Sequence, residues 1–174
     1  MPEFELPPSP RIRVLRDVIF KWEHRGPEGQ MINSGEHRLD LVPNSGLNWM
    51  SSQIAGNVSG SGTVICLGTA TATPTMGDLT LGGEITGSGL TRTTGSTSGV
   101  GALAGLAPGA TTNQTTGSFY VFNTFTASGV VTVNEAGVSP SITYNAGTTT
   151  RDLLSPVATM AIGDTLSTSF QFIL

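Results

Sequence analysis

The stretch that decides the fold is SFYVFNTFTASGVVTVNEAGV, residues 118–138. Two runs of β-branched and aromatic residues flank an Ala-Ser-Gly break at residues 127–129, and such residues fit the pleated surface of a sheet. The pattern predicts two strands joined by a short connection. We expect Phe119, Val121 and Phe125, which share one parity of the first strand, to face the core.

The composition favours a folded β protein over a disordered chain. Charged residues make up only 11% of the 174 residues, against about 25% in ordinary soluble domains. The net charge is −4 and the mean hydropathy is +0.08, whereas disordered segments combine low hydrophobicity with high net charge. Strand-like runs with turns between them are typical of packed sheets. The sequence therefore predicts an all-β fold: a β-sandwich or jelly-roll-like body with one short helix and an extended N-terminal arm or hairpin.

Charge is distributed unevenly along the chain. Residues 1–40 hold six of the eight basic and seven of the twelve acidic residues. Threonine is absent before Thr63 and abundant after it. Because the two parts differ so much in composition, we expect an N-terminal arm or hairpin over residues 1–40 and a β-sandwich body over residues 41–174.

The predicted arm contains a strand with one apolar face. A turn signal at residues 25–29 and a weaker strand from Gln30 to Val42 complete a hairpin. Since a lone two-stranded hairpin is marginal in water, it must pack on the body or on a partner. We favour the partner, and the alternative is that the hairpin completes the body's own sandwich. The candidate partner-binding residues are those of the apolar parity: Ile12, Val14, Val18, Phe20 and Trp22.

A helix and a closing strand are predicted in the body. Residues 44–56 begin with Asn-Ser and end with Gly, which are helix start and stop signals. Leu47, Met50 and Ile54 form a stripe that should cover an apolar surface. Residues 165–174 alternate between apolar and polar side chains, which predicts the last strand.

No pattern in the sequence predicts catalysis, a cofactor or a metal site. His24 and His37 lie apart from any nucleophile and are interpreted as solvated surface residues. Cys66 is the sole cysteine and is interpreted as a buried strand residue. The scarce charges of the body are interpreted as paired structural ions, because an unpaired buried charge is costly. These are Glu84, Arg92, Glu135 and Arg151. We therefore expect a protein that is not an enzyme.

Several classes of partner are disfavoured by composition. The slightly acidic balance gives no case for direct nucleic-acid binding. No apolar run reaches the roughly 20 residues that a membrane helix needs. The first residues lack a basic segment followed by an apolar run, so we expect no signal peptide.

A family resemblance emerges from the order of short motifs between residues 41 and 174. The chain resembles small virion structural proteins of tailed bacteriophages. In the first half the similar segments are LVPNSGL at 41–47 and VICLGT at 64–69, followed by Asp78, Leu81, Glu84 and Arg92. In the second half they are VTVNEAGV at 131–138, Arg151-Asp152, SPV at 155–157 and GDTL at 163–166.

The resemblance implies a non-enzymatic β protein of the virion, made in the host cytoplasm and placed on the capsid surface. On this hypothesis it is a capsid cement or decoration protein that binds the major capsid protein and copies of itself, as a homotrimer. A tail or fibre protein is the first alternative. A carbohydrate-binding module is the second, and it would need exposed aromatic residues, whereas Trp22 and Trp49 are expected to be packed.

Overall fold

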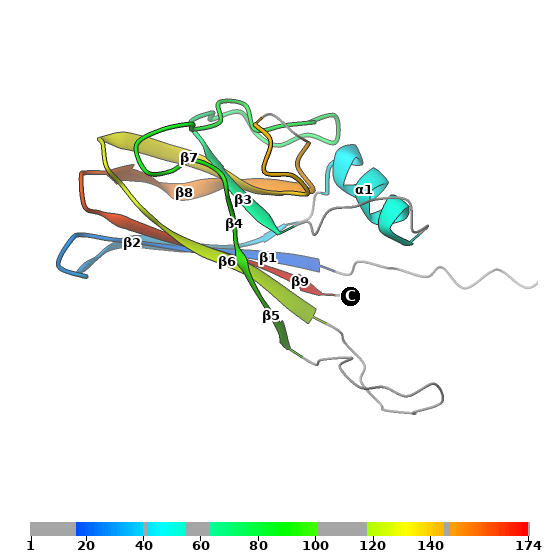
Figure 1. Ribbon diagram of the computed structural model, residues 1–174, viewed down its shortest axis with the longest axis horizontal. Helices are drawn as coiled ribbons and strands as arrows, with labels where there is room; N and C mark the ends of the chain where they lie inside the picture. Colours follow the sequence, from blue (N-terminus) through cyan, green and yellow to red (C-terminus); the bar gives the residue numbers. More distant parts are fainter. Residues whose placement is uncertain (1–16, 40–41, 55–62, 101–117, 145–146, 174) are drawn as a thin grey trace, which may run out of the picture.

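The computed structural model describes residues 17–39, 42–54, 63–100, 118–144 and 147–173 (Figure 1). These residues form nine strands and one helix. In chain order the elements are β1 (Asp17–Arg25), β2 (Met31–Leu39), α1 (Asn44–Ile54), β3 (Val64–Gly68), β4 (Thr93–Thr94), β5 (Ser96–Val100), β6 (Ser118–Thr126), β7 (Val131–Ser139), β8 (Thr150–Met160) and β9 (Thr165–Ile173). No helix among the described residues has the length and apolar character to cross a bilayer.

The strands form two antiparallel sheets packed face to face. One sheet has five strands in the order β2-β1-β9-β6-β5, and the other has four in the order β4-β3-β7-β8. Figure 1 shows the two layers, with α1 at one end. The predicted all-β, sandwich-like fold with one short helix is therefore confirmed.

The core lies between the sheets and is built by alternating side chains. In the five-stranded sheet Phe20 and Phe170 are fully buried and stack with their ring centroids 4.6 Å apart. The opposite sheet contributes smaller side chains, among them Ile65, Val133 and Met160, all at 0% exposure. Large aromatic residues from one sheet thus fill the space against aliphatic residues from the other, as close packing requires.

The N-terminal hairpin is part of this sandwich, so the predicted separation of residues 1–40 from the body is wrong for its described portion. β1 pairs with β9 along its whole length, from Asp17–Ile173 to Arg25–Thr165. Val18, Phe20 and Trp22 are at most 1% exposed. The alternative interpretation, in which the hairpin completes the body's own sandwich, is the one that the fold supports.

The central stretch forms two strands, as predicted, but they belong to different sheets. β6 lies between β9 and β5, whereas β7 lies between β3 and β8. The connection at residues 127–130 therefore crosses from one sheet to the other. Val121 and Phe125 face the core, at 0% and 3% exposure, which confirms that part of the prediction. The side chain of Phe119 lies outside the part that the structure describes.

Long connections cover the outer face of the four-stranded sheet, whereas no described segment crosses the outer face of the five-stranded sheet (Figure 1). Residues 69–92 are held over β3 by backbone hydrogen bonds such as Ile85 N to Leu67 O. The helix α1 packs against the β7–β8 connection at Gly46, where a Cβ atom would lie 2.0 Å from Thr149 O. Leu47 is 43% exposed, so this residue of the predicted apolar stripe does not cover an apolar surface. The side chain of Ile54, another residue of that stripe, lies outside the described residues.

Candidate functional site

Two buried ionic clusters lie on the covered side of the four-stranded sheet. In the first, Arg92 Nε donates to Glu84 Oε1 at 2.5 Å and Nη2 donates to Glu84 Oε2 at 2.6 Å. Arg92 Nη1 also donates to the carbonyl oxygen of Ser141 at 2.7 Å. The hydrogen bond to Ser141 ties residues 84–92 to the β7–β8 connection, and the bidentate ion pair itself is almost completely buried.

The second cluster is centred on Arg151 of β8. Its Nη1 donates to Asp78 Oδ2 at 2.7 Å, and its Nη2 lies 3.0 Å from Glu135 Oε2. Burial raises the pKa of Glu135, and Arg151 opposes that rise. Burial also acts to raise the pKa of Asp78, but hydrogen bonds from Thr75 and the charge of Arg151 outweigh it and lower that pKa. The interpretation of Glu84, Arg92, Glu135 and Arg151 as paired structural ions is confirmed.

Both histidines contact aspartates, so their interpretation as solvated surface residues is wrong. His24 is 1% exposed, and its Nε2 lies 3.0 Å from Asp164 Oδ2 in the β8–β9 turn. His37 is half-buried, and its Nδ1 lies 3.0 Å from Asp152 Oδ2. The second contact joins the edge strands β2 and β8 of the two sheets. The aspartates lie 140 and 115 residues away along the chain, which is why the local sequence around each histidine did not indicate them.

The contacts of Asp164 predict acid sensitivity. A hydrogen bond from Ala161 N, followed by the contact with His24, lowers the pKa of Asp164. A lowered carboxyl pKa stabilises the fold above the unfolded value, about 3.9, and that stabilisation is lost as the pH falls through the folded value. We expect Asp164→Asn to be less stable than the wild type at pH 5 and the difference to shrink at pH 3. Urea unfolding at both pH values measures the difference in stability between the variant and the wild type. An equal difference at both pH values would show that ionised Asp164 does not stabilise the fold.

The part of the chain that the structure describes shows neither a reactive thiol nor a metal cluster. Cys66 is fully buried, and burial raises the pKa of its thiol to about 12, so it carries no thiolate at neutral pH. This agrees with its interpretation as a buried strand residue. Among the described residues there is no group of three or more His, Cys, Asp or Glu side chains placed to hold a metal ion.

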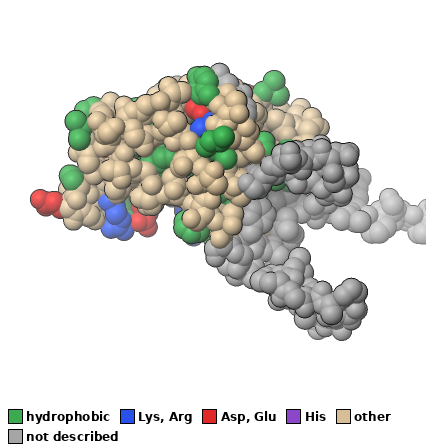
Figure 2. All heavy atoms as spheres, viewed as in Figure 1, with side chains coloured by type: hydrophobic (Ala, Val, Ile, Leu, Met, Phe, Trp, Pro, Cys, Tyr) green, Lys and Arg blue, Asp and Glu red, His purple; other side chains and the backbone are tan. Residues whose placement is uncertain are grey.

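Five exposed apolar side chains lie on α1 and on the connections beside the four-stranded sheet. The backbone ties these connections together: Asn44 N of α1 donates to Met76 O at 3.0 Å, and Thr148 N donates to Leu79 O at 2.9 Å. Figure 2 shows hydrophobic side chains in separate groups on this upper side of the molecule, with few charges between them. We call the set the loop patch, and its members are between 42% and 64% exposed: Leu47, Met76, Leu79, Ile142 and Tyr144.

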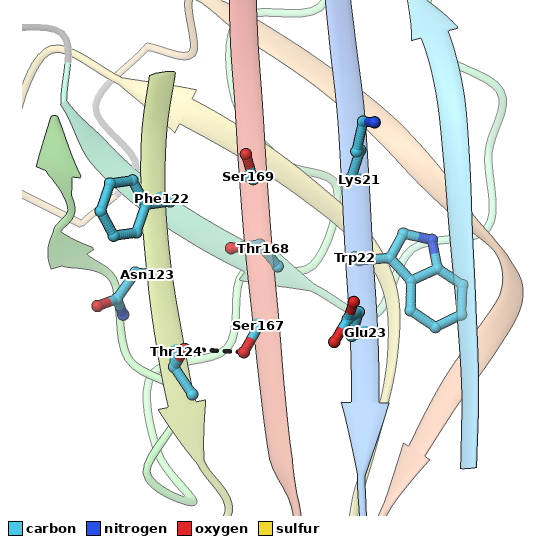
Figure 3. A pocket seen from close by; sticks show the side chains of 9 residues that line it. All are labelled: Lys21, Trp22, Glu23, Phe122, Asn123, Thr124, Ser167, Thr168 and Ser169. Atoms are coloured by element: carbon cyan, nitrogen blue, oxygen red, sulfur yellow. Dashed lines mark hydrogen bonds between the residues drawn. The ribbon is translucent and has the colours of Figure 1, made fainter. Parts of the chain in front are cut away.

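A trough lies on the opposite side, on the outer face of the five-stranded sheet (Figure 3). It is lined by residues 21–23 of β1, 122–124 of β6 and 167–169 of β9, and its volume is about 370 Å³. The floor is low because β9 places Ser167 and Ser169 between larger side chains on both neighbouring strands. On the β6 side lies Phe122, 43% exposed, whose ring is on the side of that strand away from β9, and on the β1 side lie Lys21 and Glu23 (Figure 3).

The candidate partner-binding residues are not brought together on a surface. Val18, Phe20 and Trp22 are buried in the core of this chain, so a partner has no access to them in this fold. Ile12 and Val14 lie outside the described residues. Phe122 was not among the residues predicted to bind a partner. Parity gave a signal, because Phe122 alternates with Val121, which was expected to be buried.

Comparisons of the chain with known protein families, with curated proteins and with solved structures find no significant match.

Proposed function

We propose that this chain is a non-enzymatic virion structural protein of a tailed bacteriophage. Its role would be that of a capsid cement or decoration protein, which binds neighbouring subunits of the major capsid protein and stabilises the shell by binding energy alone. The ordered motifs between residues 41 and 174 that resemble small virion proteins support this role. The loop patch supplies a surface for it.

The loop patch is the observation that carries the proposal. Exposed apolar residues that occur singly are ordinary, but several carried by segments that are hydrogen-bonded to one another favour a protein-binding surface. Leu79 at 64% and Tyr144 at 52% exposure are the kind of side chains that lose water when a partner docks.

The ionic clusters would order the loop patch before a partner binds. Arg92 anchors the β7–β8 connection through Ser141 O, next to Ile142. Arg151 anchors the segment that carries Met76 and Leu79 through Asp78 Oδ2 and Ala72 O. A loop that is ordered before binding loses less entropy when its partner docks. The buried ion pairs would therefore raise the affinity of the loop patch for its partner, although the ions themselves do not contact that partner.

In this proposal the partners are the major capsid protein and further copies of this chain, as a homotrimer. Light scattering of the purified protein tests self-association, and a strict monomer both in solution and on shells would contradict it. A tail or fibre protein would use the same patch on another virion component, so the location has to be measured directly.

The location and the patch are tested together on purified particles. Heads and tails are separated, the chain is quantified in each, and purified chain is rebound to heads stripped of it. We expect the chain in the head fraction, and we expect Leu79→Lys to weaken rebinding by about tenfold or more, because a central apolar contact is worth above 1 kcal/mol.

Val130→Lys is the matched control. Val130 is 76% exposed but lies in the β6–β7 connection, outside the loop patch, so its variant should rebind like the wild type. Recovery of the chain with tails would favour the tail alternative. Its absence from particles would overturn the proposal, and normal rebinding of Leu79→Lys would show that the patch is not the contact.

A further inference from the structure

The trough on the five-stranded sheet has a chemistry that the proposed capsid contact does not use. Its floor carries the hydroxyl groups of Ser167 and Ser169, and Thr124 Oγ1 lies 2.8 Å from Ser167 Oγ (Figure 3). The border on the β6 side is the exposed Phe122, whose ring lies on the side of that strand away from β9. The border on the β1 side carries an ammonium group from Lys21 and a carboxylate from Glu23. The side chains of Trp22 and Thr168 are buried, so the backbone of these residues and not their side chains borders the trough.

The geometry excludes a peptide strand or a helix as the occupant. The backbone of β9 is hydrogen-bonded on both sides, to β1 and to β6, so the trough has no free ladder to which a strand could be added. β1 and β6 are two strand spacings apart, about 9.4–9.8 Å before their side chains are counted. A helix with side chains is about 10–12 Å wide and does not fit between these two strands.

The charges exclude a polyanion. Lys21 Nζ already lies 2.8 Å from Glu36 Oε2, and Glu23 Oε2 already accepts from Arg25 Nη2 at 2.9 Å. β6 and β9 carry no charged residue at all. A nucleic acid or a sulfated chain would meet no unpaired cation here and would be repelled by Glu23.

An exposed aromatic ring beside a row of hydroxyl groups matches a neutral sugar. A pyranose ring presents apolar C–H groups on its faces, which stack on an aromatic ring, and hydroxyl groups at its rim, which exchange hydrogen bonds with serine, threonine and carboxylate oxygens. Ser167 and Ser169 are about 6.6–6.8 Å apart along β9, so a chain of several sugars would lie along the strand and contact both.

We propose that the trough binds a neutral glycan chain, with Phe122 as the stacking residue and with Ser167, Ser169, Thr124 and Glu23 as hydrogen-bonding groups. The site lies on the side of the sandwich opposite the loop patch. A copy docked on a shell through the loop patch would therefore present the trough outward. The binding itself does not depend on the capsid role.

The test uses the full chain and an array of neutral oligosaccharides of the glucose, mannose, galactose and N-acetylglucosamine series, followed by calorimetric titration with the hexasaccharide of the series that binds. We expect Phe122→Ala to weaken binding about tenfold or more, as the loss of one aromatic contact and its buried area would. Ser169→Tyr should abolish binding because it fills the floor. Tyr144→Ala, which removes an exposed aromatic residue of the loop patch, should bind like the wild type. Thermal unfolding checks that each variant is folded.

Four results would overturn the proposal. The first is that no neutral series binds, and the second is that Phe122→Ala and Ser169→Tyr leave binding intact. The third is binding to a sulfated glycan that depends on Lys21. The fourth is that Phe122→Ala loses self-association, which would make this face an interface between copies of the chain. None of them bears on the location of the chain in particles. Equally, absence from particles would leave the glycan result unchanged, so the two proposals fail separately.

Discussion

Phe20→Ala should lower the free energy of unfolding by about 3–5 kcal/mol, the usual cost of removing a large aromatic side chain from a core. Phe20 has no exposed surface and stacks on Phe170 of β9. The alanine would leave a cavity in the middle of the five-stranded sheet, which the neighbouring β strands cannot close. Urea unfolding followed by circular dichroism measures the change.

Lys21→Ala is the matched control for this variant. Lys21 is the next residue of the same strand, but its side chain is half-exposed and makes a surface ion pair with Glu36, so its loss should cost less than about 1 kcal/mol. Deleting residues 1–40 should prevent cooperative folding, because it removes both β1 and β2 and leaves β9 without its partner on that side. A truncated chain that folds normally, or a Phe20→Ala variant as stable as Lys21→Ala, would restore the hypothesis of a separate arm.

The sequence predicted which residues of β1 share a face, but not what that face packs against. An alternating run such as Val18, Phe20 and Trp22 fits a strand in the chain's own sheet and a strand docked on a partner equally well. The choice depends on the pairing of β1 with β9, which joins residues about 150 positions apart in the chain. The same limit applies to β6 and β7, whose short connection is compatible with a hairpin and with a crossing between sheets.

The trough was less predictable than the fold for the same physical reason. It needs Phe122 on β6, the small residues Ser167 and Ser169 on β9 and the charged pair on β1, and none of these segments is near another in sequence. Both parities of β6 carry aromatic residues, so hydrophobicity alone did not say which side is exposed.

The ionic pairs were predicted correctly because the reason for pairing can be read from the local sequence. A charge in an otherwise uncharged body needs a partner wherever the fold places it.

The second large effect is expected at Arg151. Glu135 is fully buried, and Arg151 Nη2 is 3.0 Å from its Oε2. Arg151→Ala would leave this carboxylate, and Asp78 beside it, without their cation, and breaking a buried pair in this way costs about 3–5 kcal/mol. Urea unfolding at neutral pH measures this loss. Arg25→Ala is the control, because Arg25 pairs with Glu23 at the surface and its loss should cost about 0–1 kcal/mol.

The pH dependence of the Arg151→Ala variant separates lost charge pairing from lost packing. Burial raises the pKa of Glu135 above its ordinary value, and removing the opposing cation raises it further. A raised carboxyl pKa means that the native state holds the proton more tightly, so stability is lost as the pH rises through the folded value. The destabilisation should therefore be smaller at pH 5 than at pH 8. Adding Glu135→Gln, which removes the buried charge and keeps its shape, should recover part of the loss at pH 8. An equal loss at both pH values, with no recovery in the double variant, would mean that Arg151 acts through packing alone.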